Sequence, residues 1–196
     1  KVITILLKTK IIIKELNEYA TRIKNGEIGI ISCDTILGLI SIGSIKNHHR
    51  LATIKKRSPK KPFLWIISNK SQLNKLAQTP LSPTQKKQLQ QLWPGPTTVI
   101  LPKNPKVPNQ LTGGKNTIAI RYTDFIPLQW LIEAIKAPIL STSINYTDQS
   151  ESLDIKSIPK KIVNLVDFIW TPCQPHYKKA SKIIDMTKNK KTIIRS

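Results

Sequence analysis

Apolar residues recur at helical spacing in three stretches of the chain. In residues 15–25 they fall on one face, and the stretch ends at Asn25-Gly26, a typical helix C-terminus. The same spacing predicts helices over residues 47–56 and 127–136. A fourth helix is predicted before Trp93, because Ser82-Pro83 suits an N-cap followed by the first helical position.

Short apolar runs bounded by turn-forming residues predict strands between these helices. The runs cover residues 28–32, 63–67, 97–101, 117–121, 139–142, 163–170 and 183–186. Alternating strands and helices predict the α/β class, in which helices flank a sheet. No internal repeat is present and residues 102–108 are typical of a surface loop, so we expect one domain over residues 1–196.

Several classes of protein are not expected from this sequence. It contains no run of about 20 apolar residues that could span a membrane, and lysines interrupt the apolar residues at its start, unlike an export signal. Cys33 and Cys173 form no Cys-x-x-Cys pair, and His48, His49 and His176 do not suggest ligand spacing. We therefore expect a soluble protein of the reducing cytoplasm with no metal site of its own.

The charge of the chain narrows the choice of partner. Lys and Arg number 32 against 11 Asp and Glu, which gives a formal net charge of +21. Such a balance favours nucleic acid or phosphorylated substrates. Abundant Lys, Ile and Asn are also what AT-biased coding produces, so the charge alone leaves an RNA-binding surface open.

Polar segments follow two of the predicted strands, where open α/β sheets bind their ligands. The segment 32–38 brings a hydroxyl, a thiol and a carboxylate to a strand end, although an ordinary turn would also explain it. The segment 141–145 offers hydroxyls and an amide, which can bind phosphate, ribose or carboxylate. Both segments are therefore candidate site elements.

Cations stand in two further patterns. Lys55 and Arg57 precede a proline-bounded basic turn and suit phosphate oxygens, although a solvated basic face is the alternative. Strand alternation places Thr117, Ala119 and Arg121 on one face. If Arg121 is buried there, it needs an anionic partner.

Taken in order, these patterns resemble one known family over nearly the whole chain. The motifs stand at residues 32–38, 55–57, 93–98, 117–121, 141–145 and 181–185, followed by Arg195. They are similar to the motifs of the YrdC-type threonylcarbamoyl-AMP synthases. The resemblance implies a single YrdC-like domain of the short form, with a twisted open mixed β-sheet and flanking helices around a basic concave cleft.

The resemblance also implies a reaction and a set of site residues. Threonine, bicarbonate and ATP would give threonylcarbamoyl-adenylate and pyrophosphate, the first step towards threonylcarbamoyladenosine in tRNA. Lys55 and Arg57 would be catalytic and would hold the triphosphate. The other implied residues bind threonine or bicarbonate (Cys33, Arg121, Ser141, Ser181) or the nucleotide (Thr117, Ser143, Asn145, Arg195).

The expected cofactor is Mg²⁺, held mainly by ATP oxygens and water because carboxylates are few. A downstream threonylcarbamoyl-transferase complex is the expected partner, and direct binding of tRNA is left open.

The chain departs from the family pattern at four positions. Ser32 replaces Pro, Cys33 replaces Thr, Leu37 replaces an aromatic residue, and Asp148 stands where Gly is usual. We expect lower affinity rather than loss of chemistry, and Cys33 could instead be a small core residue. The alternatives are a non-catalytic RNA-binding relative and a carbamoyl-transfer domain of hydrogenase-maturation proteins, the latter disfavoured because accessory segments are not seen in the sequence.

Overall fold

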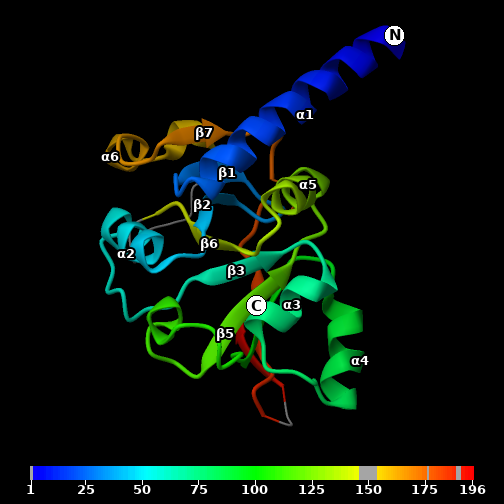
Figure 1. Ribbon diagram of the computed structural model, residues 1–196, viewed down its shortest axis with the longest axis vertical. Helices are drawn as coiled ribbons and strands as arrows, with labels where there is room; N and C mark the ends of the chain where they lie inside the picture. The colour runs from blue at the N-terminus through cyan, green and yellow to red at the C-terminus, as the bar shows by residue number, and fades with distance from the viewer. Residues whose placement is uncertain (1, 146–153, 176, 189–190) are drawn as a thin grey trace.

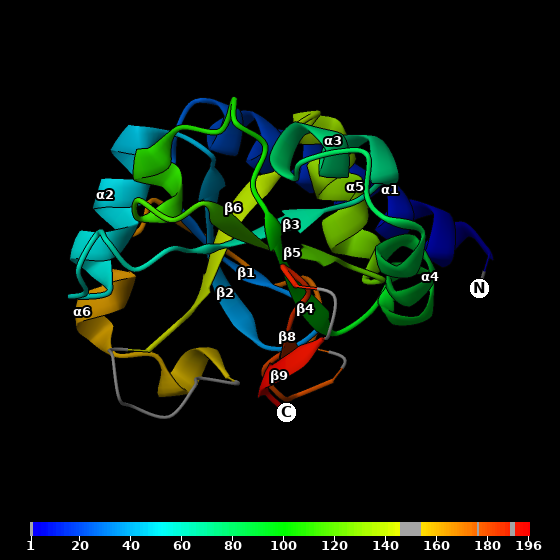
Figure 2. The same cartoon turned by 90° about the horizontal axis from the view of Figure 1, so that it is seen from below.

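The computed structural model describes residues 2–145, 154–175, 177–188 and 191–196, with the side chains of residues 2–12 excepted. Asp148 and His176, singled out in the sequence, lie outside the described residues. In this part of the chain nine strands form one mixed sheet in the order β7-β1-β2-β6-β3-β5-β4-β8-β9 (Figures 1 and 2). The strands are β1 (Gly29–Ser32), β2 (Leu37–Ile42), β3 (Leu64–Ile67), β4 (Thr97–Pro102), β5 (Thr117–Tyr122), β6 (Ile139–Ser143), β7 (Phe168–Trp170), β8 (Lys182–Asp185) and β9 (Thr192–Arg195).

Helices cover both faces of this sheet (Figures 1 and 2). They are α1 (Val2–Lys24), α2 (Ile45–Ile54), α3 (Lys70–Leu76), α4 (Pro83–Leu92), α5 (Ile126–Ile135) and α6 (Lys160–Val163), with short 3-10 turns η1 (Asn109–Thr112) and η2 (Ile155–Ser157). The predicted α/β class with a twisted open mixed sheet is confirmed.

Two apolar cores form because strand residues alternate between the faces. Trp65 and Ile67 of β3 pack in the core under α2, α3 and α4, whereas Ile66 between them packs in the core under α1 and α5. The same alternation separates Ile30 from Ile31 in β1. The register of β1 and of β3 is thus fixed by burial on both faces.

The structure corrects the predicted elements at several points. The run 163–170 is not one strand, because Val163 ends α6 and β7 begins only at Phe168. The strand β2, the helix α3 and the strand β9 were not predicted. The predicted helices and the remaining strands are present, and α1 begins well before residue 15.

One part of the sheet positions a cavity. The helices α1 and α5 cover β1, β6 and β3, but on the same face β5, β4 and β8 present Arg121, Ala119, Thr98 and Ile183 to a cavity. The site described below occupies this open face.

Candidate active site

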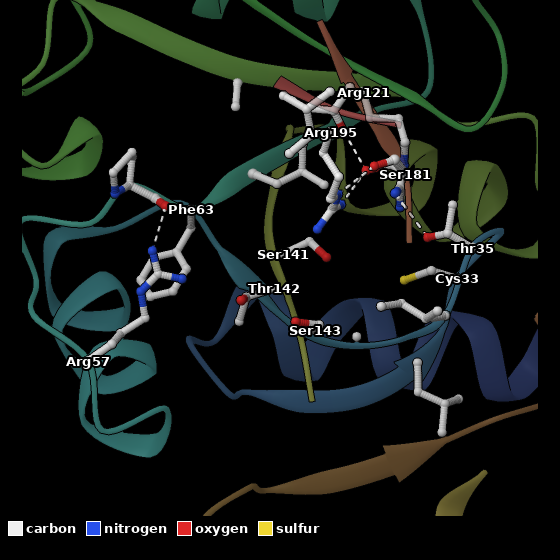
Figure 3. A pocket seen from close by; sticks show the side chains of 18 residues that line it. Cys33, Thr35, Arg57, Phe63, Arg121, Ser141, Thr142, Ser143, Ser181 and Arg195 are labelled. Atoms are coloured by element: carbon white, nitrogen blue, oxygen red, sulfur yellow. Dashed lines mark hydrogen bonds between the residues drawn. The ribbon is translucent and has the colours of Figure 1, made fainter. Parts of the chain in front are cut away.

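A cavity of about 240 Å³ lies on the open face of the sheet (Figure 3). The turn between β1 and β2, the segment before β3, and the strands β5, β6, β4, β8 and β9 all contribute to its lining. The lining residues are Cys33, Thr35, Ile36, Leu37, Gly38, Arg57, Pro62, Phe63, Leu64, Thr98, Ala119, Arg121, Ser141, Thr142, Ser143, Ser181, Ile183 and Arg195.

A row of paired residues across four strands sets the polar floor of the cavity. Thr98 of β4 pairs with Arg121 of β5 on one side and with Ile183 of β8 on the other. Ile183 pairs in turn with Arg195 of β9. Because paired residues in neighbouring strands project to the same face, Arg121 and Arg195 both reach the cavity.

Arg121 is buried and already has an anionic partner. Its Nη2 lies 2.9 Å from Oδ1 of Asp34, and the two side chains are 3% and 0% exposed. Its Nη1 donates to Oγ1 of Thr35 at 3.0 Å. Burial raises the pKa of the Asp34 carboxyl, while the Arg121 guanidinium opposes that rise. The predicted need of Arg121 for an anion is therefore met from within the chain, and its plane is fixed.

Arg195 and two hydroxyls form a second polar group. Oγ1 of Thr98 and Oγ of Ser181 lie 2.8 Å apart in a buried hydrogen bond. Arg195 donates from Nε to the Ser181 carbonyl at 2.9 Å and from Nη2 to Ser181 Oγ at 3.3 Å. These bonds attach β9 to the cavity wall.

Arg57 lies across the cavity from this group (Figure 3). Its guanidinium stacks over the ring of Phe63 at 4.7 Å, and Nη2 donates to the Pro62 carbonyl at 3.1 Å. Phe63 also contacts the buried His48 ring, 4.9 Å away and edge-on. Burial lowers the pKa of the Arg57 guanidinium, which nevertheless stays charged at neutral pH. Phe63 thus holds the Arg57 guanidinium at the edge of the cavity.

Lys55 is placed differently from Arg57. Its Nζ donates to the Ser143 carbonyl and to Oδ1 of Asn145, both at 2.6 Å. The Ser143 hydroxyl donates to the same Asn145 oxygen at 2.7 Å. Lys55 therefore binds the end of β6 without lining the cavity, whereas Ser143 lines it.

Cys33 both lines the cavity and packs in the core. Its side chain is 1% exposed and belongs to the core under α1 and α5. Burial is the main cause that raises the pKa of its thiol to about 12. A Cβ added at Gly38 would lie 3.0 Å from the Cys33 sulfur and 3.3 Å from the Ser141 hydroxyl, so glycine allows this close approach.

The structure brings together seven of the ten residues proposed from sequence: Cys33, Arg57, Arg121, Ser141, Ser143, Ser181 and Arg195 line the cavity. Lys55, Asn145 and Thr117 are not among the lining residues. Thr117 shares its face with Arg121 but starts β5 opposite Pro102. The roles given to these residues remain predictions.

Sequence reasoning left out Thr35, Thr98 and Phe63, which line the cavity, and Asp34, which pairs with Arg121. A signal was present for three of them, since Asp34 and Thr35 belong to the segment 32–38 and Thr98 ends the motif 93–98. Phe63 carried no such signal, because its place at the start of a buried run is typical of any core residue.

The cavity suits an anionic ligand. Its described lining contains three arginines, several hydroxyls and no Asp or Glu. Hydroxyls and guanidinium groups are donors that fit phosphate and carboxylate oxygens. Nowhere in the described part of the chain do three His, Cys, Asp or Glu side chains gather closely enough to hold a metal ion.

In the described part of the chain, no helix has both the length and the apolar character that a membrane span requires.

Comparison with known proteins gives consistent matches. The family model Sua5_yciO_yrdC, described as "Telomere recombination", matches residues 21–196. A threonylcarbamoyl-AMP synthase of Baumannia cicadellinicola is 35% identical over 157 residues, which cover 77% of this chain and 74% of that protein. A putative threonylcarbamoyl-AMP synthase of Methanocaldococcus jannaschii is 31% identical over 202 residues, covering 96% of this chain and 93% of its own length.

A solved structure shows the same fold. Sua5 of P. abyssi, crystallised in complex with L-threonine, superposes with a TM-score of 0.84 at 24% sequence identity. The superposition covers 92% of this chain but 53% of that chain, so this chain spans about half the length of that relative.

Proposed function

Because this chain belongs to the Sua5/yciO/yrdC family, we infer that it is a threonylcarbamoyl-AMP synthase. Curated relatives of that name match most of its length. The reaction we propose is formation of threonylcarbamoyl-adenylate and pyrophosphate from L-threonine, bicarbonate and ATP, in the nucleotidyltransferase class.

One observation carries the proposal at the level of the site: Arg57 stands at one end of the cavity and Arg121 with Arg195 at the other, with the hydroxyls of β6 between them (Figure 3). A reaction that joins an amino acid, with its carboxylate, to bicarbonate and a triphosphate brings several negative charges into one space. Cations fixed on both sides neutralise such charge without reorganising during the reaction.

The chemistry asks for positioning more than for a protein nucleophile. The threonine amine and bicarbonate give a carbamate and water, and the carbamate oxygen attacks the α-phosphorus while pyrophosphate leaves. We assign Arg57 to the phosphates of ATP, and Arg195 with Ser143 to the nucleotide. Arg121 and the hydroxyls of Ser141 and Ser181 would hold threonine and its carbamate.

We propose that Lys55 acts on this site through its neighbours. By binding the Ser143 carbonyl and Asn145, it fixes the end of β6. Its ammonium is also close enough to Ser143, a lining residue, to add positive potential to the cavity. We propose that Lys55 and Asn145 position the nucleotide-binding hydroxyl of Ser143. Thr117, at the start of β5, is proposed to contribute to nucleotide binding.

Magnesium is proposed to enter with ATP. The Asp34 carboxylate is paired with Arg121, and the described residues offer no cluster of metal ligands. A divalent ion held by phosphate oxygens and water would need little from the protein.

Further proposals concern the setting of the reaction. We propose that residues 1–196 act as one domain, that the protein works in the cytoplasm, and that its product passes to a threonylcarbamoyl-transferase complex acting on tRNA. The competing proposal of a non-catalytic RNA-binding relative is weakened by the three arginines that meet at the cavity, since an RNA surface does not require their convergence.

The test is turnover by the pure protein. Incubation with ATP, threonine, bicarbonate and Mg²⁺ should give threonylcarbamoyl-adenylate, detected by mass spectrometry, and an equal amount of pyrophosphate. Arg57→Ala should remove most of this activity, whereas Lys60→Ala in the same basic turn, exposed and outside the cavity, should not. Pyrophosphate release that is independent of threonine would contradict the assignment.

A further inference from the structure

A second pocket lies on the other face of the sheet, between α3 and α4. It has a volume of about 550 Å³, within the range of about 300–1,000 Å³ common for small-ligand sites. Its floor is apolar, formed by Ile67, Leu73 and Leu89. The remaining lining residues are Lys70, Ser71, Asn74, Leu81, Lys86, Gln90, Trp93, Pro94 and Tyr122. None of the groups assigned to the reaction lies here.

Two aromatic side chains, Trp93 and Tyr122, line this pocket. Trp93 and Tyr122 are half-buried, so part of each ring is covered and part is reachable. The Trp93 indole Nε1 donates to the Thr97 carbonyl at 2.7 Å, and the Gly95 amide donates to the Tyr122 carbonyl at 2.9 Å. The first bond holds the Trp93 ring itself, whereas the second fixes only the backbone of Tyr122. A ring held as Trp93 is offers a stacking surface to a planar ligand at little entropic cost, and the Tyr122 ring lines the same pocket.

The charge at the rim is one-sided. Lys70 comes from α3 and Lys86 from α4, both exposed, and the described lining contains no Asp or Glu. Glu133, which reaches the N-terminus of α3, is bound by the Ser68 hydroxyl and the Asn69 amide at 2.6 and 2.7 Å. Anionic groups are therefore favoured at the mouth of the pocket.

Amide side chains complete the set. Asn74 and Gln90 stand beside the apolar floor and are exposed. Each can donate and accept, which is what the edge of a nucleobase requires. Stacking rings, amides and two lysines together match a planar heterocycle that carries a phosphate.

We propose that the pocket between α3 and α4 binds a nucleobase with its adjacent phosphate, the base against Trp93 and Tyr122 and the phosphate between Lys70 and Lys86. A free mononucleotide and an unpaired nucleotide of an RNA strand share this chemistry. The site is separate from the reaction cavity, because Arg121 and Tyr122 are consecutive in β5 and project to opposite faces.

Binding can be followed at Trp93 itself. The chain has four tryptophans, so a ¹⁵N-labelled sample gives few indole signals, and sequential assignment identifies that of Trp93. Titration with AMP should shift this signal saturably, and adenosine, which lacks the phosphate, should bind about tenfold more weakly. A single-stranded oligoadenylate that binds more tightly than AMP would identify RNA as the source, and equal affinity would identify the free nucleotide.

Matched lysine variants separate this pocket from the reaction cavity. Lys70→Ala/Lys86→Ala removes the rim charges, whereas Lys75→Ala/Lys87→Ala removes two exposed charges from the same helices outside the pocket. The first pair should weaken AMP binding at the Trp93 signal at least about tenfold, and the second should change it little. All four positions lie outside the proposed catalytic machinery, so turnover should be unaffected.

Two results would overturn the proposal. One is a Trp93 signal that neither AMP nor oligoadenylate shifts, or shifts equally in both lysine variants. The other is adenosine binding as tightly as AMP, which would mean that Lys70 and Lys86 do not recognise the phosphate.

Discussion

The buried pair of Asp34 and Arg121 allows a sharp test of how the cavity is built. Asp34→Asn keeps the size of the side chain but removes its negative charge, so that Arg121 stays buried without a compensating anion. The two side chains are 0% and 3% exposed, and Nη2 lies 2.9 Å from Oδ1. Removing one partner of such a pair costs about 3–5 kcal/mol of the free energy of unfolding.

This magnitude translates into a measurable melting temperature. For a chain of this size about 1 kcal/mol corresponds to 2–4 °C, so Asp34→Asn should melt about 6–20 °C below the wild type by circular dichroism. The lower end is expected if the amide oxygen introduced by the substitution still accepts a hydrogen bond from Arg121. Saturating threonine should raise the melting temperature of the variant more than that of the wild type, because its carboxylate would meet the uncompensated guanidinium.

A double variant distinguishes charge from shape. Asp34→Asn/Arg121→Met removes both charges and should recover much of the lost stability. Activity should stay low, because the guanidinium proposed to bind threonine is gone. A single variant that melts within about 1 °C of the wild type would refute the reasoning, since the pair would then contribute almost nothing. So would a double variant that melts as low as the single one.

Four further predictions concern the side chains of Arg57, Cys33 and Asp167. Arg57→Ala should lower kcat/KM by about 2–4 kcal/mol of transition-state stabilisation with the melting temperature almost unchanged, which steady-state kinetics and thermal unfolding will check. The Cys33 thiol has a pKa of about 12, which leaves a thiolate fraction on the order of 10⁻⁴ at pH 8, so Cys33 should resist iodoacetamide while exposed Cys173 reacts. In steady-state kinetics, Cys33→Thr should lower the KM for threonine about 2- to 13-fold. The hydrogen bond from Arg50, more than any other contact, lowers the pKa of the Asp167 carboxyl. The stability that ionised Asp167 contributes is therefore present above the unfolded pKa of about 3.9 and is lost as the pH falls through the lower folded pKa. The melting temperature of Asp167→Asn should lie below that of the wild type at pH 7, and the difference should disappear in acid.

Most of the strands and helices could be predicted because their apolar periods are clear. The strand β2 was hidden because Gly38 interrupts its apolar run and both of its faces are buried, so no alternation marks it. The helix α3 was missed for a different reason, since it has only seven residues and too few turns to show a period. Its Asn69 cap, which accepts from the Gln72 amide, was the available signal.

The site could be predicted in part because its residues fall in ordered motifs. Cys33, Arg121 and Ser181 were all proposed and all line the cavity. Sequence could not show that Asp34 would satisfy Arg121, because that pairing depends on how the turn after β1 approaches β5 in space. Nor could it show that Lys55 turns towards Ser143 while Arg57 turns towards Phe63, because neighbouring cations on one turn take different directions only through tertiary packing.

The strand β9 links the affinity of the site for nucleotide to a local opening of the sheet. It pairs only with β8 in the described part of the chain, and all four of its residues are exposed. Strands with so little burial open at free energies far below that of global unfolding, and the cation of Arg195 leaves the cavity with each opening. The measured affinity for nucleotide is then the intrinsic affinity reduced by the fraction of molecules in which β9 is closed. Amide hydrogen exchange at residues 192–195 would accordingly slow as the fraction of molecules with bound nucleotide rises. Exchange at β9 would therefore report nucleotide binding.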